Sequence, residues 1–160
     1  MPVLLEARSS HHWPLTDWLD GFMDLNWTYR FGPVTQDLAV ATWKNQQGCA
    51  LAQALHFEPS QIVQFNGNPG LLATATKRDD GNMEVTVTTQ AVAYGVHFEA
   101  FGWQATDEFF HLPPGSTKII LFKPLSTNNG RWYASLTALN ARHSSTITLK
   151  AVAPGLTKVH

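Results

Sequence analysis

The chain has 160 residues, a formal net charge of −1, and eleven lysines and arginines scattered along its length. This balance excludes the strongly basic classes of protein, so we expect neither nucleic acid nor a membrane surface as a partner. Charged residues make up only 14 % of the chain while aromatic residues reach 11 %, which predicts a surface that is partly covered by other protein.

The single cysteine, Cys49, excludes an intrachain disulfide, so the fold does not depend on an oxidising compartment. The opening "MPVLLEARSS" has neither the basic and apolar regions of a signal peptide nor a membrane-spanning stretch. The compartment is therefore left open, and we expect a cytoplasmic protein if Met1 is the native start.

Residues 15–23 carry the one helical pattern in the chain. Their apolar side chains recur at i, i+3, i+4, i+7 and i+8, namely Leu15, Trp18, Leu19, Phe22 and Met23. This period, with Thr16 placed as a cap, predicts one short amphipathic helix.

Alternation with a period of two residues replaces the helical pattern further along the chain. Residues 27–31 place three aromatic side chains on one face of a predicted strand, which a Gly-Pro pair ends. A hairpin follows, with arms at 37–44 and 49–57 and a turn at 45–48.

The stretch "EPSQIVQFNGNPG", residues 58–70, is rich in turn residues and predicts a linker between two domains. Short strand candidates follow it at 71–77, 83–90, 94–100, 108–112, 117–124, 131–139 and 145–151. Alternation is clearest where Met83, Val85, Val87 and Thr89 point to one face, which predicts one buried face and one wet face. The predicted fold class is all-β: an immunoglobulin-like antiparallel β-sandwich, preceded by a partial β-sandwich segment with one short helix.

The stretch "DEFFHLPPGSTKIILFKP", residues 107–124, joins an acidic pair to a tight turn and an apolar run. The letters "PPGS" suit a type II turn with Pro114 and Gly115 at its centre. The run "KIILF" is apolar on both faces, which predicts a central strand covered on both sides. Asp107 and Glu108 stand at a strand entrance, where we expect a carboxylate to accept backbone N–H groups.

Three segments resemble, in the same order, the C-terminal region of glycoside hydrolase family 2 β-mannosidases. "TDEFFHLPPGSTKIILFKP", 106–124, is similar to the family's S-D-N-Y/F-F-H/D-L-x-P-G segment, with Glu108 where Asn is common. "FMDLNWTYRFGPVTQDLAVATW", 22–43, resembles its Y-R-F-G-P-P segment, with Val34 replacing the second proline. "SLTALNARHSSTITL", 135–149, resembles its A-L-N segment and last strand, so the resemblance spans nearly the whole chain.

The resemblance implies a parent enzyme with a catalytic (β/α)₈ barrel and several sandwich domains, which hydrolyses terminal non-reducing β-D-mannose residues with retention. Residues 1–57 would then close the penultimate immunoglobulin-like domain, 58–70 would be the linker, 71–153 the last such domain and 154–160 a tail. The expected partners are the barrel and the other domains of the parent. Open strand edges in the first 57 residues also predict packing on the final sandwich or pairing with a second copy.

Retaining glycosidases need two carboxylates about 5 Å apart, and in this family both are glutamates on barrel strands. The glutamates of this chain are Glu6, Glu58, Glu84, Glu99 and Glu108. None stands in the family's catalytic context, so we assign no catalytic residue and expect no activity from this chain alone. Asp107 and Glu108 are a poor acid pair, because neighbours on a strand point to opposite faces. The dispersed histidines lack the spacing of a zinc site, and we expect no metal and no cofactor.

Two of the six tryptophans, Trp103 and Trp132, stand close to glycines in positions where we expect exposure. Because sugar rings stack on flat aromatic faces, these two are the candidate carbohydrate-binding residues, with a manno-oligosaccharide as ligand. The leading hypothesis remains a non-catalytic accessory region that supports the parent's barrel by packing. The alternatives are a carbohydrate-binding β-sandwich module and a structural interaction domain unrelated to sugar.

Overall fold

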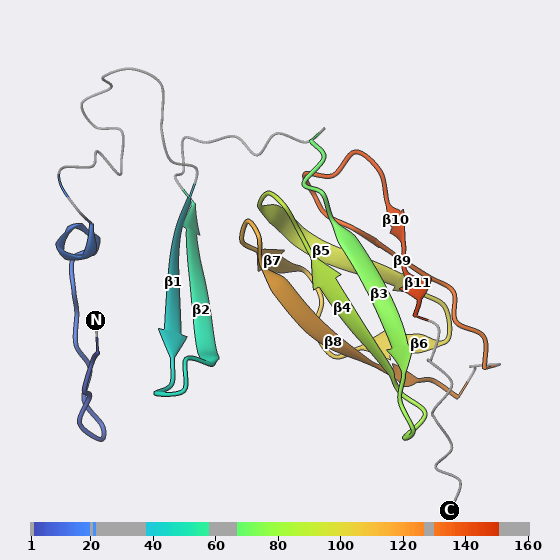
Figure 1. The fold of residues 1–160 in the computed structure, drawn as a ribbon, viewed down its shortest axis with the longest axis horizontal. Coiled ribbons are helices and arrows are strands. Elements are labelled where there is room, and N and C mark those ends of the chain that lie inside the picture. The colour runs from blue at the N-terminus through green and yellow to red at the C-terminus, as the bar shows by residue number, and fades with distance from the viewer. Residues whose placement is uncertain (1, 20, 22–37, 58–66, 127–129, 151–160) are drawn as a thin grey trace, which may run out of the picture. The chain divides into compact units, whose positions relative to one another are not determined.

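A computed structural model describes residues 2–19, 21, 38–57, 67–126 and 130–150 (Figure 1). The chain divides into two compact units, Met1–Gln61 and Ile62–His160. Among the described residues, no helix is long and apolar enough to cross a membrane.

The first unit begins with η1, a 3-10 helix at Leu15–Trp18. The predicted amphipathic helix was therefore too long, because Leu19 adopts an extended conformation with φ −106° and ψ 137°. Thr16 does not act as the cap, since the residue before the helix is Pro14 and no side chain caps it. A short segment that buries no apolar face lacks the packing that would stabilise an α-helix against its nucleation cost. The end of the predicted helix, Phe22 and Met23, lies outside the described residues.

The predicted hairpin is confirmed. Strands β1 (Leu38–Lys44) and β2 (Ala50–Phe57) pair antiparallel, in a register that places Leu38 opposite Phe57. Asn45 closes the turn, because its N–H donates to the Cys49 carbonyl at 2.9 Å and its side-chain Oδ1 accepts the Cys49 N–H at 2.8 Å. The strand predicted at 27–31 lies outside the described residues.

The second unit is a sandwich of two sheets that enclose one core (Figure 1). The five-stranded sheet has the order β11-β3-β4-β8-β6 and the four-stranded sheet the order β10-β9-β5-β7. The strands are β3 (Leu72–Lys77), β4 (Met83–Thr88), β5 (Ala93–Ala100), β6 (Trp103–Ala105), β7 (Phe110–Leu112), β8 (Thr117–Pro124), β9 (Ala134–Thr137), β10 (Ser145–Thr146) and β11 (Thr148–Leu149). Neighbouring strands pair antiparallel except β11 and β3, which are parallel. The all-β, sandwich class predicted from the sequence is confirmed.

Alternation builds the core as predicted, because Met83, Val85, Val87 and Thr89 are all buried. The Thr89 hydroxyl is not left unpaired, since it lies 2.6 Å from the Ala91 carbonyl oxygen and can donate to it. The inward face of β4 thus consists of three apolar side chains, and the buried hydroxyl of Thr89, just after the strand, is satisfied.

The last predicted strand, 145–151, is in fact two short strands in different sheets. β10 pairs with β9 in the four-stranded sheet, and β11 pairs with β3 in the five-stranded sheet. Ile147 lies between them with its side chain buried and its N–H donating to the Ala134 carbonyl at 2.9 Å. A single buried residue therefore carries the chain from one sheet to the other.

The run "KIILF" forms β8, and β8 lies between β4 and β6 as expected of a central strand. Ile120 and Phe122 point into the core, but Ile119 is 62 % exposed on the outer face. Within the described residues of this unit, the second sheet covers one face of β8 and Ile119 is open on the other. Cover of that outer face by a neighbouring domain stays a prediction. The turn before β8 is confirmed, since the Ser116 N–H donates to the Pro113 carbonyl at 3.2 Å and Gly115 has φ 66°.

Candidate functional site

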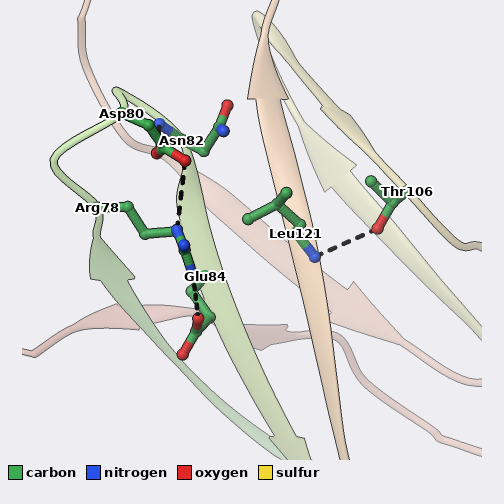
Figure 2. A network of polar contacts seen from close by, with 6 residues as sticks. All are labelled: Arg78, Asp80, Asn82, Glu84, Thr106 and Leu121. Carbon is green, nitrogen blue, oxygen red and sulfur yellow. Dashed lines mark hydrogen bonds and ion pairs between the residues drawn. The ribbon is translucent and has the colours of Figure 1, made fainter.

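The acidic-aromatic segment 106–109 carries the chain from β6 in the five-stranded sheet to β7 in the four-stranded sheet. Thr106 makes two hydrogen bonds to Leu121 of β8. Its N–H donates to the Leu121 carbonyl at 2.9 Å. Its hydroxyl Oγ1 accepts the Leu121 N–H at 3.3 Å, as Figure 2 shows. The side chain of Thr106 thus replaces a backbone acceptor where the chain leaves the sheet.

The two carboxylates of this crossover have separate partners. Asp107 Oδ2 lies 2.6 Å from Lys118 Nζ, in a partly exposed ion pair. Glu108 Oε2 accepts the Phe98 N–H at 3.1 Å and lies 3.0 Å from His97 Nδ1. The expectation that a carboxylate here accepts a backbone N–H is therefore confirmed for Glu108. Asp107 thus contacts strand β8 and Glu108 contacts strand β5. The two carboxylates fasten the crossover to one strand of each sheet, which is a structural role.

Phe109 has an unusual backbone, with φ 57° in the left-handed region. Its N–H donates to the Val96 carbonyl at 2.7 Å, and its ring stacks on the His97 imidazole with centroids 4.7 Å apart and planes 10° apart. Phe109 directly precedes β7, whose first residue, Phe110, lies opposite Val96 of β5. The side chain remains 63 % exposed.

Trp103 and Trp132 lie together at one end of the core. Their ring centroids are 5.3 Å apart in a T-shaped arrangement, and Trp132 contacts Phe122 in the same way at 5.4 Å. Trp103 is only 9 % exposed, and its Nε1 donates to the Arg131 carbonyl at 3.1 Å. The expected exposure of Trp103 was therefore wrong, because it begins β6 with its side chain pointing inward rather than lying in a loop.

Both of these tryptophans line a hollow of about 400 Å³. The other residues that line it are Lys77, Gly81, Met83, Pro124, Leu125, Gly130 and Leu149. Trp132 Nε1 is buried and has no hydrogen-bond partner within the described part of the chain. Sugar binding by Trp103 and Trp132 stays a prediction.

A charged network stabilises the turn between β3 and β4 (Figure 2). Arg78 Nη1 lies 2.8 Å from Glu84 Oε2, and its Nε lies 3.5 Å from Asp80 Oδ2. Asp80 Oδ1 accepts the Asn82 N–H at 3.0 Å, and this bond chiefly holds the pKa of Asp80 below its ordinary value. The hydrogen bond that the Arg78 guanidinium donates to Glu84 is the chief cause that raises the pKa of Arg78. The network is local and exposed, which is typical of a stabilised turn.

Among the described residues, no group of three or more His, Cys, Asp or Glu side chains is placed to hold a metal ion. Sequence reasoning missed the cluster of His97, Glu108 and Phe109. Glu108 and Phe109 are adjacent, but His97 lies 11 residues before Glu108 on another strand. Their proximity follows from the pairing of β5 with β7, which no periodic pattern within one segment reveals.

A family model named Ig_mannosidase and described as an Ig-fold domain matches residues 67–151. No curated protein matches the chain. The matched stretch contains two of the three segments that suggested the resemblance, 106–124 and 135–149, while 22–43 precedes it. The chain belongs to the Ig_mannosidase family of Ig-fold domains, and its sandwich is the family's fold.

Proposed function

We propose that the chain is a non-catalytic accessory region of a β-mannosidase-like enzyme of glycoside hydrolase family 2. The parent enzyme would hydrolyse terminal non-reducing β-D-mannose residues, and this region would support its catalytic barrel by packing. The family match over residues 67–151 is the observation that carries this proposal.

The hairpin β1–β2 supports a packing role. Its cross-strand partners place Leu38, Val40, Leu55 and Phe57 on one face. They place alanines with Trp43 on the other face, as in the opposed pair Ala41 and Ala54. Polar side chains share these faces, since Thr42 and Gln53 lie on the first and His56 on the second. A two-stranded hairpin is marginally stable alone, and one that exposes apolar side chains on both faces is stabilised by cover on both. We propose that other domains of the parent, or the same hairpin of a second copy, supply that cover.

The carboxylates of the crossover support a structural role. Asp107 contacts Lys118, whereas Glu108 contacts His97 and the Phe98 N–H. A retaining pair must both face one sugar ring from about 5 Å apart. Two carboxylates that brace different strands do not meet that requirement, so the catalytic glutamates are proposed to lie in the parent's barrel.

An antibody against this chain tests the link to a β-mannosidase. It is used to precipitate antigen from an extract of the source cells, and the precipitate is assayed with 4-nitrophenyl β-D-mannopyranoside. We expect hydrolysis in the precipitate and none from the purified chain alone. Complete depletion of the antigen without any co-precipitated activity would contradict the proposal.

A second candidate function is sugar binding at the hollow. It rests on Trp132 Nε1, which lies beside Trp103 and has no hydrogen-bond partner among the residues that the structure describes. A buried donor without an acceptor is costly, and a sugar hydroxyl in the hollow would accept from it. Calorimetric titration with mannobiose and mannotetraose tests this, using Trp132→Phe to remove the donor and Trp43→Phe on the hairpin as the control. Binding that Trp132→Phe weakens and Trp43→Phe does not would support it, whereas no heat of binding in the wild type would reject it.

A further inference from the structure

The outer face of the four-stranded sheet carries a row of polar side chains beside one exposed ring. His97 lies opposite Thr137 and Glu99 opposite Ser135 in the pairing of β5 with β9. Directly opposed residues of antiparallel strands share a face, and the intervening Phe98 is buried on the other side. Phe109, stacked on His97, stands at the β7 end of this row. We define the ligand face by these five outward residues: His97, Glu99, Phe109, Ser135 and Thr137.

The left-handed backbone conformation of Phe109 is unfavourable, and burial of its own side chain does not offset this cost. A bulky residue in the left-handed region is strained relative to the ordinary regions. Glycine or asparagine would relieve that cost, yet the sequence places here an aromatic side chain that is 63 % exposed. An exposed ring held in a strained backbone is a feature of binding sites, because its gain comes from a contact outside the chain.

The surroundings of Phe109 fix its ring and the neighbouring imidazole in place. Glu108 Oε2 accepts the Phe98 N–H and lies 3.0 Å from His97 Nδ1, so the Nδ1 proton points to the carboxylate. In a neutral imidazole with this tautomer, the other ring nitrogen, Nε2, is the acceptor. The nearly parallel stack, with 10° between the planes, keeps one face of the Phe109 ring against His97.

We propose that this ligand face binds a neutral oligosaccharide, with one pyranose ring stacked on Phe109 and its hydroxyl groups bonded to His97, Glu99 and Thr137. A flat aromatic face beside acceptors and hydroxyls matches a ring that is apolar on its faces and polar at its edge. The carboxylates of Glu99 and Glu108 disfavour an anionic ligand. The proposal is separate from the hollow at Trp132 and does not depend on the parent's activity.

The test is an NMR titration of the whole ¹⁵N-labelled chain with mannotetraose and, in parallel, with cellotetraose, each to about 10 mM. We expect saturable shifts of the backbone amides of His97, Glu99 and Thr137 with at least one of the two sugars. Phe109→Asn, which suits the left-handed backbone and removes the ring, should weaken binding at least tenfold without lowering Tm. Phe101→Asn removes another strongly exposed phenylalanine, in the turn that joins β5 to β6, and should leave binding unchanged.

Several results would overturn the proposal. These are no saturable shift with either sugar in the wild type, binding that survives Phe109→Asn, and shifts that gather around the hollow and disappear in Trp132→Phe. Shifts of the ligand face that depend on protein concentration without sugar would assign the face to a second copy of the chain. The antibody test is independent, so failure there would leave sugar binding at Phe109 standing, and the reverse is also true.

Discussion

The hairpin β1–β2 and the sandwich are both made of alternating strands, but only the sandwich has an interior. None of the described residues between 2 and 57 is buried, whereas the sandwich buries side chains from both of its sheets. The difference is in the number of layers rather than in strand propensity, because a strand gains stability only when one of its faces is covered. The sandwich is therefore expected to fold alone, and the hairpin to need a partner.

The largest expected effect comes from emptying the core of the sandwich. Phe122 is fully buried and contacts Phe98 edge-on at 5.0 Å. Phe122→Ala should lower the free energy of unfolding by about 3–5 kcal/mol, through lost burial and the cavity left behind. The matched change in the hairpin, Leu51→Ala, should cost less than about 0.5 kcal/mol, because Leu51 is mostly exposed. Urea denaturation of both variants measures the difference, and equal losses would show that the hairpin contributes to the same core.

A smaller effect is expected at the crossover between the sheets. Glu108→Ala removes the acceptor of the Phe98 N–H and should cost about 1–3 kcal/mol, since a partly buried donor is left unpaired. Glu108→Gln keeps an oxygen acceptor and should recover more than half of that loss. Thermal unfolding of the two variants measures both losses of stability. Equal destabilisation would mean that the charge of Glu108, rather than its hydrogen bond to the Phe98 N–H, stabilises the fold.

The smallest effect is expected at the turn between β3 and β4. The folded pKa of Asp80 is lowered below its ordinary value of 3.8, chiefly by the bond from the Asn82 N–H. Its ionised form therefore adds stability above the unfolded pKa, and this is lost as pH falls through the folded pKa. Asp80→Asn should flatten the dependence of Tm on pH in this acid range. Asp79→Asn changes the net charge equally and serves as the control, and an identical flattening in both would contradict the assignment.

The regular parts of the sandwich could be predicted because each is set by neighbours in the sequence. Met83, Val85 and Val87 alternate on a strand whose period the structure keeps, and the turn at Gly115 follows from local backbone preference. The hairpin was predictable for the same reason, since a short turn fixes its register.

The irregular parts were hidden because they depend on pairing across the fold. Strand β6 has only three residues, too few for a period, and it was missed. The change of sheet at Ile147 depends on long-range pairing, because the residues before it pair with β9 and the residues after it pair with β3. The contact of Glu108 with His97 depends on the pairing of β5 with β7, which no pattern within one strand reveals.

Hydrogen exchange of the purified chain, followed by mass spectrometry, tests most directly whether the sandwich is self-sufficient and the hairpin is not. Our account predicts that the amides of β4 and β8 exchange many orders of magnitude more slowly than those of unstructured peptides, while the amides of β1 and β2 exchange nearly as fast as such peptides. Strong protection of β1 and β2 in a strictly monomeric sample would contradict it, because the hairpin would then be covered without any partner.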